Sequence, residues 1–148
     1  MLKGLDPALT PDLLYQLARM GHGDKVVVVD RNYPAYAAGR PVAHLAGIGA
    51  PAAVAAICSV MPLDTFVPSP LAAMEVVGDP ARPAVTAEVV AAAEAAEGRA
   101  INVRWIERFA FYSEARGAAV IVATAEARPY GCYILTKGVW PSFTPPTP

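Results

Sequence analysis

The chain has 148 residues, a formal net charge of -1, and 55% hydrophobic but only 17% charged residues. This length and composition indicate one globular domain with a sizeable core and exclude a disordered chain. No basic run offers a footprint for nucleic acid or an anionic membrane, and no stretch approaches the roughly 20 apolar residues that a membrane span requires. We therefore expect a small neutral ligand, with neither nucleic acid nor membrane as a partner.

The amino-terminal segment and the cysteines predict a cytoplasmic protein. Residues 1–6 contain no apolar segment of the kind that secretion signals carry. Cys58 and Cys132 lie among apolar residues without CxxC spacing, which predicts two reduced thiols rather than a disulfide or a zinc site.

The first predicted elements are a helix over residues 11–20 and a strand over residues 26–29. Thr10 is a suitable N-cap for the helix, and Gly21 suits its end. The strand consists of four valines, and its apolar character on both faces predicts a buried, central parallel strand covered by helices on each side. The turn formers and aromatics of residues 31–39 predict a functional loop.

The later part of the chain continues to alternate between helices and strands. We expect strands over residues 42–45, 71–77, 101–106, 118–124 and 132–137, and helices over residues 49–60, 83–97 and 107–116. This order predicts an α/β fold, a single layered domain with a mainly parallel central sheet flanked by helices. The domain is expected to span residues 1–140, followed by a Pro-rich tail (141–148) that is extended or disordered.

Two side chains able to move protons at neutral pH bracket the valine strand. His22 lies before it between two glycines, and Asp30 follows it directly, where α/β sheets generally bind ligands, although aspartate is also a common turn residue. Five steps of roughly 3.3 Å from Lys25 to Asp30 separate the strand ends by about 16 Å, which is too far for one small ligand to span. Either the loop 21–24 folds back over the sheet, or His22 of one subunit faces Asp30 of another, which we favour.

These residues also have other interpretations. His22 could merely stabilise the helix end through the helix dipole. The glycines around it do not form a phosphate loop, because such loops follow a strand and precede a helix. A metal site from His22, Asp24, Asp30 and His44 is a minor alternative that matches no recognised ligand spacing, so we expect neither a metal nor a cofactor.

Two later segments carry further candidate residues. Arg108 lies among aromatic residues at the start of a predicted helix, where the structural alternative is a solvated or salt-bridged helix face. Tyr130 offers a hydroxyl just before the final strand, and Gly131 permits close approach of a ligand, with a hairpin turn as the structural alternative. Four aromatic residues are candidates for an apolar platform against a ligand, although such residues are as often core or interface residues: Tyr33, Tyr36, Tyr133 and Trp140.

Together these segments resemble the fucose mutarotase and ribose pyranase family, RbsD/FucU. The resemblance covers nearly the whole chain, through the segments Met1-Leu2-Lys3, Met20-Gly21-His22-Gly23-Asp24, Arg108-Phe109-Ala110-Phe111-Tyr112, Tyr130-Gly131 and Lys137-Gly138-Val139. Arg108 with its Phe-Ala-Phe-Tyr run is similar to the fucose branch, because the ribose branch carries a histidine at that position.

The resemblance implies a cofactor-independent enzyme that interconverts the anomers of L-fucose or a related sugar. It implies His22 as the proton donor and a set of sugar contacts made by Asp30, Arg108, Tyr130, Gly131 and Cys132. We assign catalytic roles to His22, Asp30 and Tyr130. The resemblance also implies homo-oligomers, ring-shaped (pentamers or decamers) or smaller, with sites at subunit interfaces.

One residue departs from the family pattern. The family usually has asparagine where this chain has Cys132, and a thiol cannot replace the paired donor and acceptor of an amide, so the preferred sugar can differ from fucose. Two other functions are therefore kept in view: a non-catalytic monosaccharide-binding or transport-associated protein, and a structural oligomerisation domain.

Overall fold

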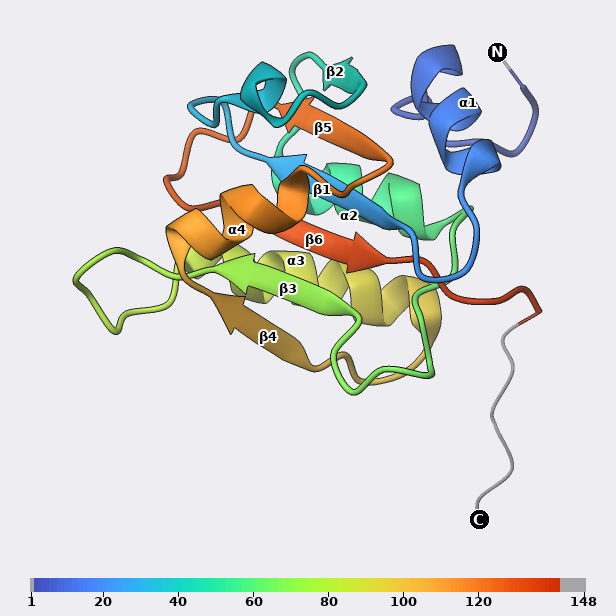
Figure 1. The fold of residues 1–148 in the computed structure, drawn as a ribbon. Coiled ribbons are helices and arrows are strands. Elements are labelled where there is room, and N and C mark those ends of the chain that lie inside the picture. Colours follow the sequence, from blue (N-terminus) through green and yellow to red (C-terminus); the bar gives the residue numbers. More distant parts are fainter. Residues whose placement is uncertain (1, 142–148) are drawn as a thin grey trace.

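A computed structural model describes residues 2–141, which form one sheet with helices on both faces (Figure 1). The elements in chain order are α1 (Pro11–Arg19), β1 (Lys25–Val29), the 3₁₀ helix η1 (Ala35–Ala38), β2 (Val42–Leu45), α2 (Ala50–Cys58), β3 (Leu71–Met74), α3 (Ala84–Glu97), β4 (Val103–Ile106), α4 (Arg108–Ala115), β5 (Val120–Thr124) and β6 (Tyr133–Thr136). Every predicted helix and strand is present, and the largest difference is that β3 ends three residues early. Apart from residue 141, the predicted Pro-rich tail lies outside the described residues.

The sheet has six strands in the order β2-β5-β1-β6-β3-β4. β1 pairs with β5, β5 with β2, and β3 with β4 in parallel, whereas β6 runs antiparallel to both of its neighbours, β1 and β3. The prediction of a mainly parallel sheet is confirmed. β1 lies between β5 and β6, so it is an interior strand, as its composition predicted.

The valines of β1 are divided between two hydrophobic clusters. Val26 and Val28 face the cluster that includes buried residues of α1, α2 and α3, whereas Val27 and Val29 face the cluster under α4. Figure 1 shows α2 and α3 behind the sheet and α4 in front of it. All four side chains are 0% exposed, because hydrophobic clusters cover both faces of the strand.

The direction of β6 determines which loops meet. The parallel strands β1, β4 and β5 all have their carboxyl ends at the same end of the sheet. β6 begins at that end because it runs in the opposite direction. The residues after β1, the start of α4 after β4, and the residues before β6 therefore gather there. Within residues 2–141, no helix is long and apolar enough to cross a membrane.

Candidate functional site

A pocket of about 230 Å³ lies at the end of the sheet where β1 stops and β6 begins. Its lining residues come from the loop after β1, the end of β3, the helix α4 and the loop before β6: Asp30, Asn32, Tyr33, Met74, Arg108, Tyr112, Pro129, Tyr130 and Cys132. The structure thus brings together four of the predicted site residues. Gly131 lies between two of them, where an added Cβ would be 3.7 Å from the Asp30 Cβ atom.

Asp30 contributes a buried carboxylate to this pocket, with only 6% of the residue exposed. Its Oδ1 accepts a hydrogen bond from the backbone N–H of Asn32 at 2.9 Å, and its Oδ2 accepts one from the Cys132 thiol at 3.5 Å. Because a carboxylate offers about four lone-pair sites, these two bonds leave acceptor capacity for a ligand hydroxyl.

The side chain of Cys132 is directed at Asp30. Burial, and next the negative charge of Asp30, hold the pKa of the Cys132 thiol well above its usual range. The group is therefore a neutral thiol at physiological pH and donates only a weak hydrogen bond. It does not supply the amide pair that an asparagine would offer.

Arg108 is the first residue of α4 and forms part of the pocket wall. The preceding residue, Glu107, caps the helix by accepting hydrogen bonds from the backbone N–H groups of Phe109 and Ala110. The Arg108 guanidinium lies 4.7 Å from the Phe109 ring centroid, and it forms no ion pair within residues 2–141. Its Nε is buried without a hydrogen-bond partner, an unfavourable arrangement that a ligand oxygen would relieve.

The tyrosines of the pocket supply hydroxyl groups. Tyr130 has a φ of 60°, and among the described residues no other non-glycine residue has a positive φ. Such strained backbone persists only where the surrounding structure holds it, often at functional sites. Burial raises the pKa of Tyr33 to about 12, so its hydroxyl stays protonated at neutral pH. Tyr33 and Tyr112 meet edge to face at 5.3 Å between ring centroids.

His22 is not in this pocket. Its Nε2 lies 3.0 Å from Oδ1 of Asp64, whose side chain is only 3% exposed, and its ring packs 5.2 Å from that of Phe66. The neighbouring Gly23 N–H bonds to the carbonyl of Lys137, just after β6. The loop therefore does not fold back over the sheet within one chain, and a meeting of His22 with Asp30 across a subunit interface stays a prediction.

Asp64 is a candidate functional residue that the sequence analysis missed. It lies 42 residues after His22, so no local spacing could have paired the two. A buried carboxylate beside a histidine can fix the ring orientation and its tautomer. The contact places His22 against a residue outside α1, and its catalytic role stays a prediction.

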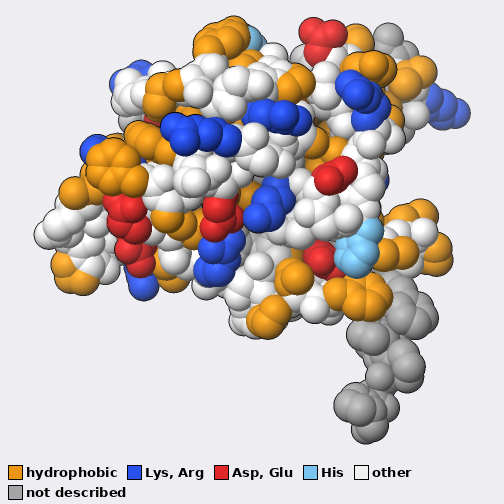
Figure 2. Space-filling model, in the orientation of Figure 1, with side chains coloured by type: hydrophobic (Ala, Val, Ile, Leu, Met, Phe, Trp, Pro, Cys, Tyr) orange, Lys and Arg blue, Asp and Glu red, His pale blue; other side chains and the backbone are white. Residues whose placement is uncertain are grey.

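A second pocket of about 350 Å³ adjoins the first through Asp30 and Tyr33. It contains His44, whose Nε2 lies 2.6 Å from the Tyr36 hydroxyl. Figure 2 shows two separate pale-blue histidine patches, one at the top and one on the right of the visible face. Within the described chain, no three His, Cys, Asp or Glu side chains gather in a way that could hold a metal ion, so the four residues considered as metal ligands do not come together.

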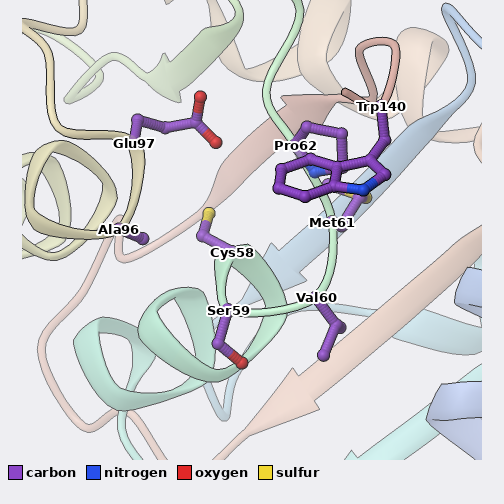
Figure 3. A pocket seen from close by; sticks show the side chains of 8 residues that line it. All are labelled: Cys58, Ser59, Val60, Met61, Pro62, Ala96, Glu97 and Trp140. Atoms are coloured by element: carbon purple, nitrogen blue, oxygen red, sulfur yellow. The ribbon is translucent and has the colours of Figure 1, made fainter. Parts of the chain in front are cut away.

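Figure 3 shows another pocket, of about 380 Å³, which contains none of the predicted catalytic residues. It is lined by the end of α2, the residues after it, the end of α3 and Trp140. Burial and the nearby Glu97 raise the pKa of Cys58 to about 12, so its thiol is protonated. Glu97 is already engaged, because one oxygen accepts the Leu63 N–H at 2.9 Å and the other lies 3.6 Å from Arg99. This pocket therefore offers no free acid–base pair.

The remaining aromatic candidates have different surroundings. Tyr133 is fully buried, with its hydroxyl 3.0 Å from that of Thr86, and so cannot contact a ligand. Trp140 is exposed at the rim of the pocket in Figure 3, and Tyr36 lines the pocket with His44. Of the four, only Tyr33 lines the pocket that holds Arg108 and Tyr130.

Comparisons with known proteins cover nearly the whole chain. Residues 3–140 match the model of the RbsD / FucU transport protein family. The chain is 41% identical over 142 residues to an L-fucose mutarotase of Actinobacillus pleuropneumoniae serotype 5b (strain L20), covering 95% of this chain and 99% of that protein. It is 43% identical over 145 residues to an L-fucose mutarotase of Glaesserella parasuis serovar 5 (strain SH0165), covering 97% and 99%. The crystal structure of a fucose mutarotase in complex with L-fucose from Streptococcus pneumoniae superposes with a TM-score of 0.87 at 33% identity, covering 93% of this chain and 99% of that one.

Proposed function

Because the chain belongs to the RbsD / FucU family, we propose that it is a cofactor-independent isomerase that interconverts the α and β anomers of L-fucose or a related monosaccharide. The observation that carries the proposal is one pocket in which Asp30, Arg108 and Tyr130 converge, in a chain that aligns with L-fucose mutarotases over almost its full length. A cytoplasmic location is part of the proposal.

The reaction needs an acid and a base but no redox step. A base takes the proton from the anomeric hydroxyl while an acid protonates the ring oxygen, and the bond between C1 and the ring oxygen breaks to give the open aldehyde. Rotation about C1–C2 followed by reclosure on the other carbonyl face gives the second anomer. General acid–base help of about 10²–10⁴-fold is sufficient for a reaction that already proceeds spontaneously.

We assign roles from the chemistry of the side chains. His22 protonates the ring oxygen, Asp30 accepts a proton or orients a hydroxyl, and Tyr130 is a hydrogen-bonding or relay group. Arg108 holds sugar hydroxyls or stabilises developing negative charge, and its unpartnered Nε supports this role. Gly131 and Cys132 contact the sugar beside Tyr130. Asp64 keeps the His22 ring in a fixed orientation through the contact at 3.0 Å.

The separation of His22 from Asp30 within one chain supports a site shared between subunits of a homo-oligomer, ring-shaped as a pentamer or decamer. A mixing experiment tests this arrangement. H22A and D30N proteins, each inactive alone, are combined under conditions of subunit exchange, and random mixing should restore up to about a quarter of the wild-type sites. No recovery in demonstrably mixed oligomers would contradict the shared site.

Exchange NMR on the anomeric protons of L-fucose, D-ribose and related sugars tests the activity itself. We expect faster α/β exchange for L-fucose or a related sugar in the presence of the protein. The H22A variant should lose this acceleration while the sugar still binds. Saturable binding with unchanged exchange across the panel would instead show a sugar-binding protein without catalysis, and an absence of any ligand-induced thermal stabilisation would favour a structural oligomerisation domain.

A further inference from the structure

Glu126 is a buried carboxylate in the loop between β5 and β6, four residues before Tyr130. Only 4% of the residue is exposed, and it does not line the pocket that contains Asp30 and Tyr130. A buried charge of this kind is costly unless hydrogen bonds compensate it. The hydrogen-bond partners of the carboxylate therefore indicate which segments Glu126 holds together.

The carboxylate of Glu126 links its own loop to the start of α2 through hydrogen bonds. Oε1 accepts hydrogen bonds from the backbone N–H of Arg128 at 3.0 Å and from the Arg128 Nε at 2.8 Å. Oε2 accepts one from Nη2 of Arg128 at 3.1 Å and one from the backbone N–H of Ala50, the first residue of α2, at 3.2 Å. The residues leading to Tyr130 are thus tied to a rigid element.

The backbone of Glu126 reaches the other side of the pocket. Its carbonyl accepts the N–H of Arg31 at 3.0 Å, directly after Asp30, and its own N–H donates to the Thr124 hydroxyl at 3.2 Å. One residue therefore connects the turn that follows β1 with the loop that carries Tyr130. Both segments supply side chains to the same pocket.

Packing against Gly131 adds a steric constraint. A Cβ atom at Gly131 would come within 2.9 Å of the Glu126 Cγ and 3.2 Å of the Arg128 carbonyl oxygen. The side chain of Glu126 therefore occupies the space beside the residue that follows Tyr130. The positive φ of Tyr130 persists inside a loop bounded by these contacts.

We propose that Glu126 is a positioning residue, which acts through Tyr130 by holding its loop in the geometry that presents the phenol to the sugar. This inference rests on the proposed mutarotase function. Glu126 does not line the pocket, and both of its carboxylate oxygens already accept hydrogen bonds from Arg128 or Ala50. Asp30 and Arg108 have other supports in β1 and α4, so loss of Glu126 should affect the chemical step more than sugar binding.

The test is a double-mutant cycle between E126Q and Y130F, measured as α/β exchange at saturating L-fucose. E126Q should lower the saturated rate about 10–100-fold in the wild-type background, as loss of an outer supporting contact typically does. In the Y130F background the same change should lower it less than about 3-fold, because residues that act through one another are not additive. The half-saturating sugar concentration should change less than the rate.

E88Q is the matched control, because Glu88 is exposed and binds the same Arg128 guanidinium at 2.6 Å without touching Glu126. Its rate should stay within about 2-fold of wild type. E126D, one methylene shorter, keeps the charge but cannot span both partners, and serves as the second variant if E126Q does not fold.

The outcomes distinguish a failure of the positioning role of Glu126 from a failure of the proposed mutarotase function. An accelerating wild type with an equally active E126Q protein refutes the role of Glu126. An equal loss in both backgrounds also refutes it, because that pattern indicates general destabilisation rather than action through Tyr130. A wild type that does not accelerate exchange refutes the mutarotase function itself, independently of any variant.

Discussion

Replacement of Glu126 by glutamine should destabilise the fold in a pH-dependent manner. Hydrogen bonds from the Arg128 side chain, more than any other contact, lower the pKa of Glu126 from 4.5 to about 2. A carboxyl group whose pKa is lower in the folded than in the unfolded state stabilises the fold above the unfolded pKa. That stabilisation is lost as the pH falls from about 5 towards 2, while the E126Q protein has no such group to titrate.

The size of the effect follows from the pKa difference. At roughly 1.4 kcal/mol per pKa unit, the fall from 4.5 to about 2 corresponds to about 3.5 kcal/mol of folding free energy at pH 7. Because 43% of the Arg128 side chain is exposed, solvent screening reduces this to about 2 kcal/mol. For a chain of this size, 2 kcal/mol corresponds to a difference of about 4–8 °C in Tm. More than half of it should disappear between pH 5 and pH 3.

Thermal unfolding of wild-type, E126Q and E88Q proteins between pH 3 and pH 7 measures this effect. Carboxylates common to wild type and E126Q cancel in the difference between their melting temperatures. E88Q removes an exposed partner of the same arginine and should cost less than about 1 kcal/mol at pH 7. A Tm difference between wild type and E126Q that stays constant with pH, or grows as the pH falls, would refute the reasoning.

Three further predictions concern other side chains. D64N should lower the saturated exchange rate about 10-fold because the His22 ring loses its orienting carboxylate, and an unchanged rate would show that the contact has no role in the reaction. C132N should change the ratio of exchange rates for L-fucose and D-ribose about 10-fold, since an amide restores paired hydrogen bonding at the pocket; the same sugar panel measures it, and an unaltered ratio would separate position 132 from sugar choice. Y133F should lower the free energy of unfolding by about 1 kcal/mol because the buried Thr86 hydroxyl loses its partner. Denaturant titration would reveal this loss, and no change would mean that the Thr86 hydroxyl finds another hydrogen-bond partner.

Local patterns were sufficient to predict the helices and strands. Thr10 accepts the Leu13 N–H as an N-cap, and Pro11 begins α1, because capping and proline preferences act within one turn. The four valines of β1 are buried on both faces because their pattern has no polar side. The end of β3 was less predictable, since the apolar residues Val76 and Val77 follow shortly after its last residue, Met74.

The candidate site was predictable only in part. The resemblance supplied Asp30, Arg108 and Tyr130 as one set, and the pocket contains all three. It could not show that Cys132 donates to Asp30 or that Nε of Arg108 is buried without a partner. These depend on side-chain directions that no spacing in the sequence encodes.

By itself, then, the amino-acid order determined the elements and the α/β class, because these depend on periodicity and caps within short segments. The motifs of the family resemblance added the candidate residues other than Asp64. The tertiary structure alone decided that β6 runs antiparallel to β1. Tyr130, just before β6, therefore lies at the same end of the sheet as Asp30, just after β1. The tertiary structure also decided that His22 pairs with Asp64 at the other end of β1. Strand order and direction arise from packing between segments far apart in the chain, and that packing brings residues together or separates them whatever their distance in sequence.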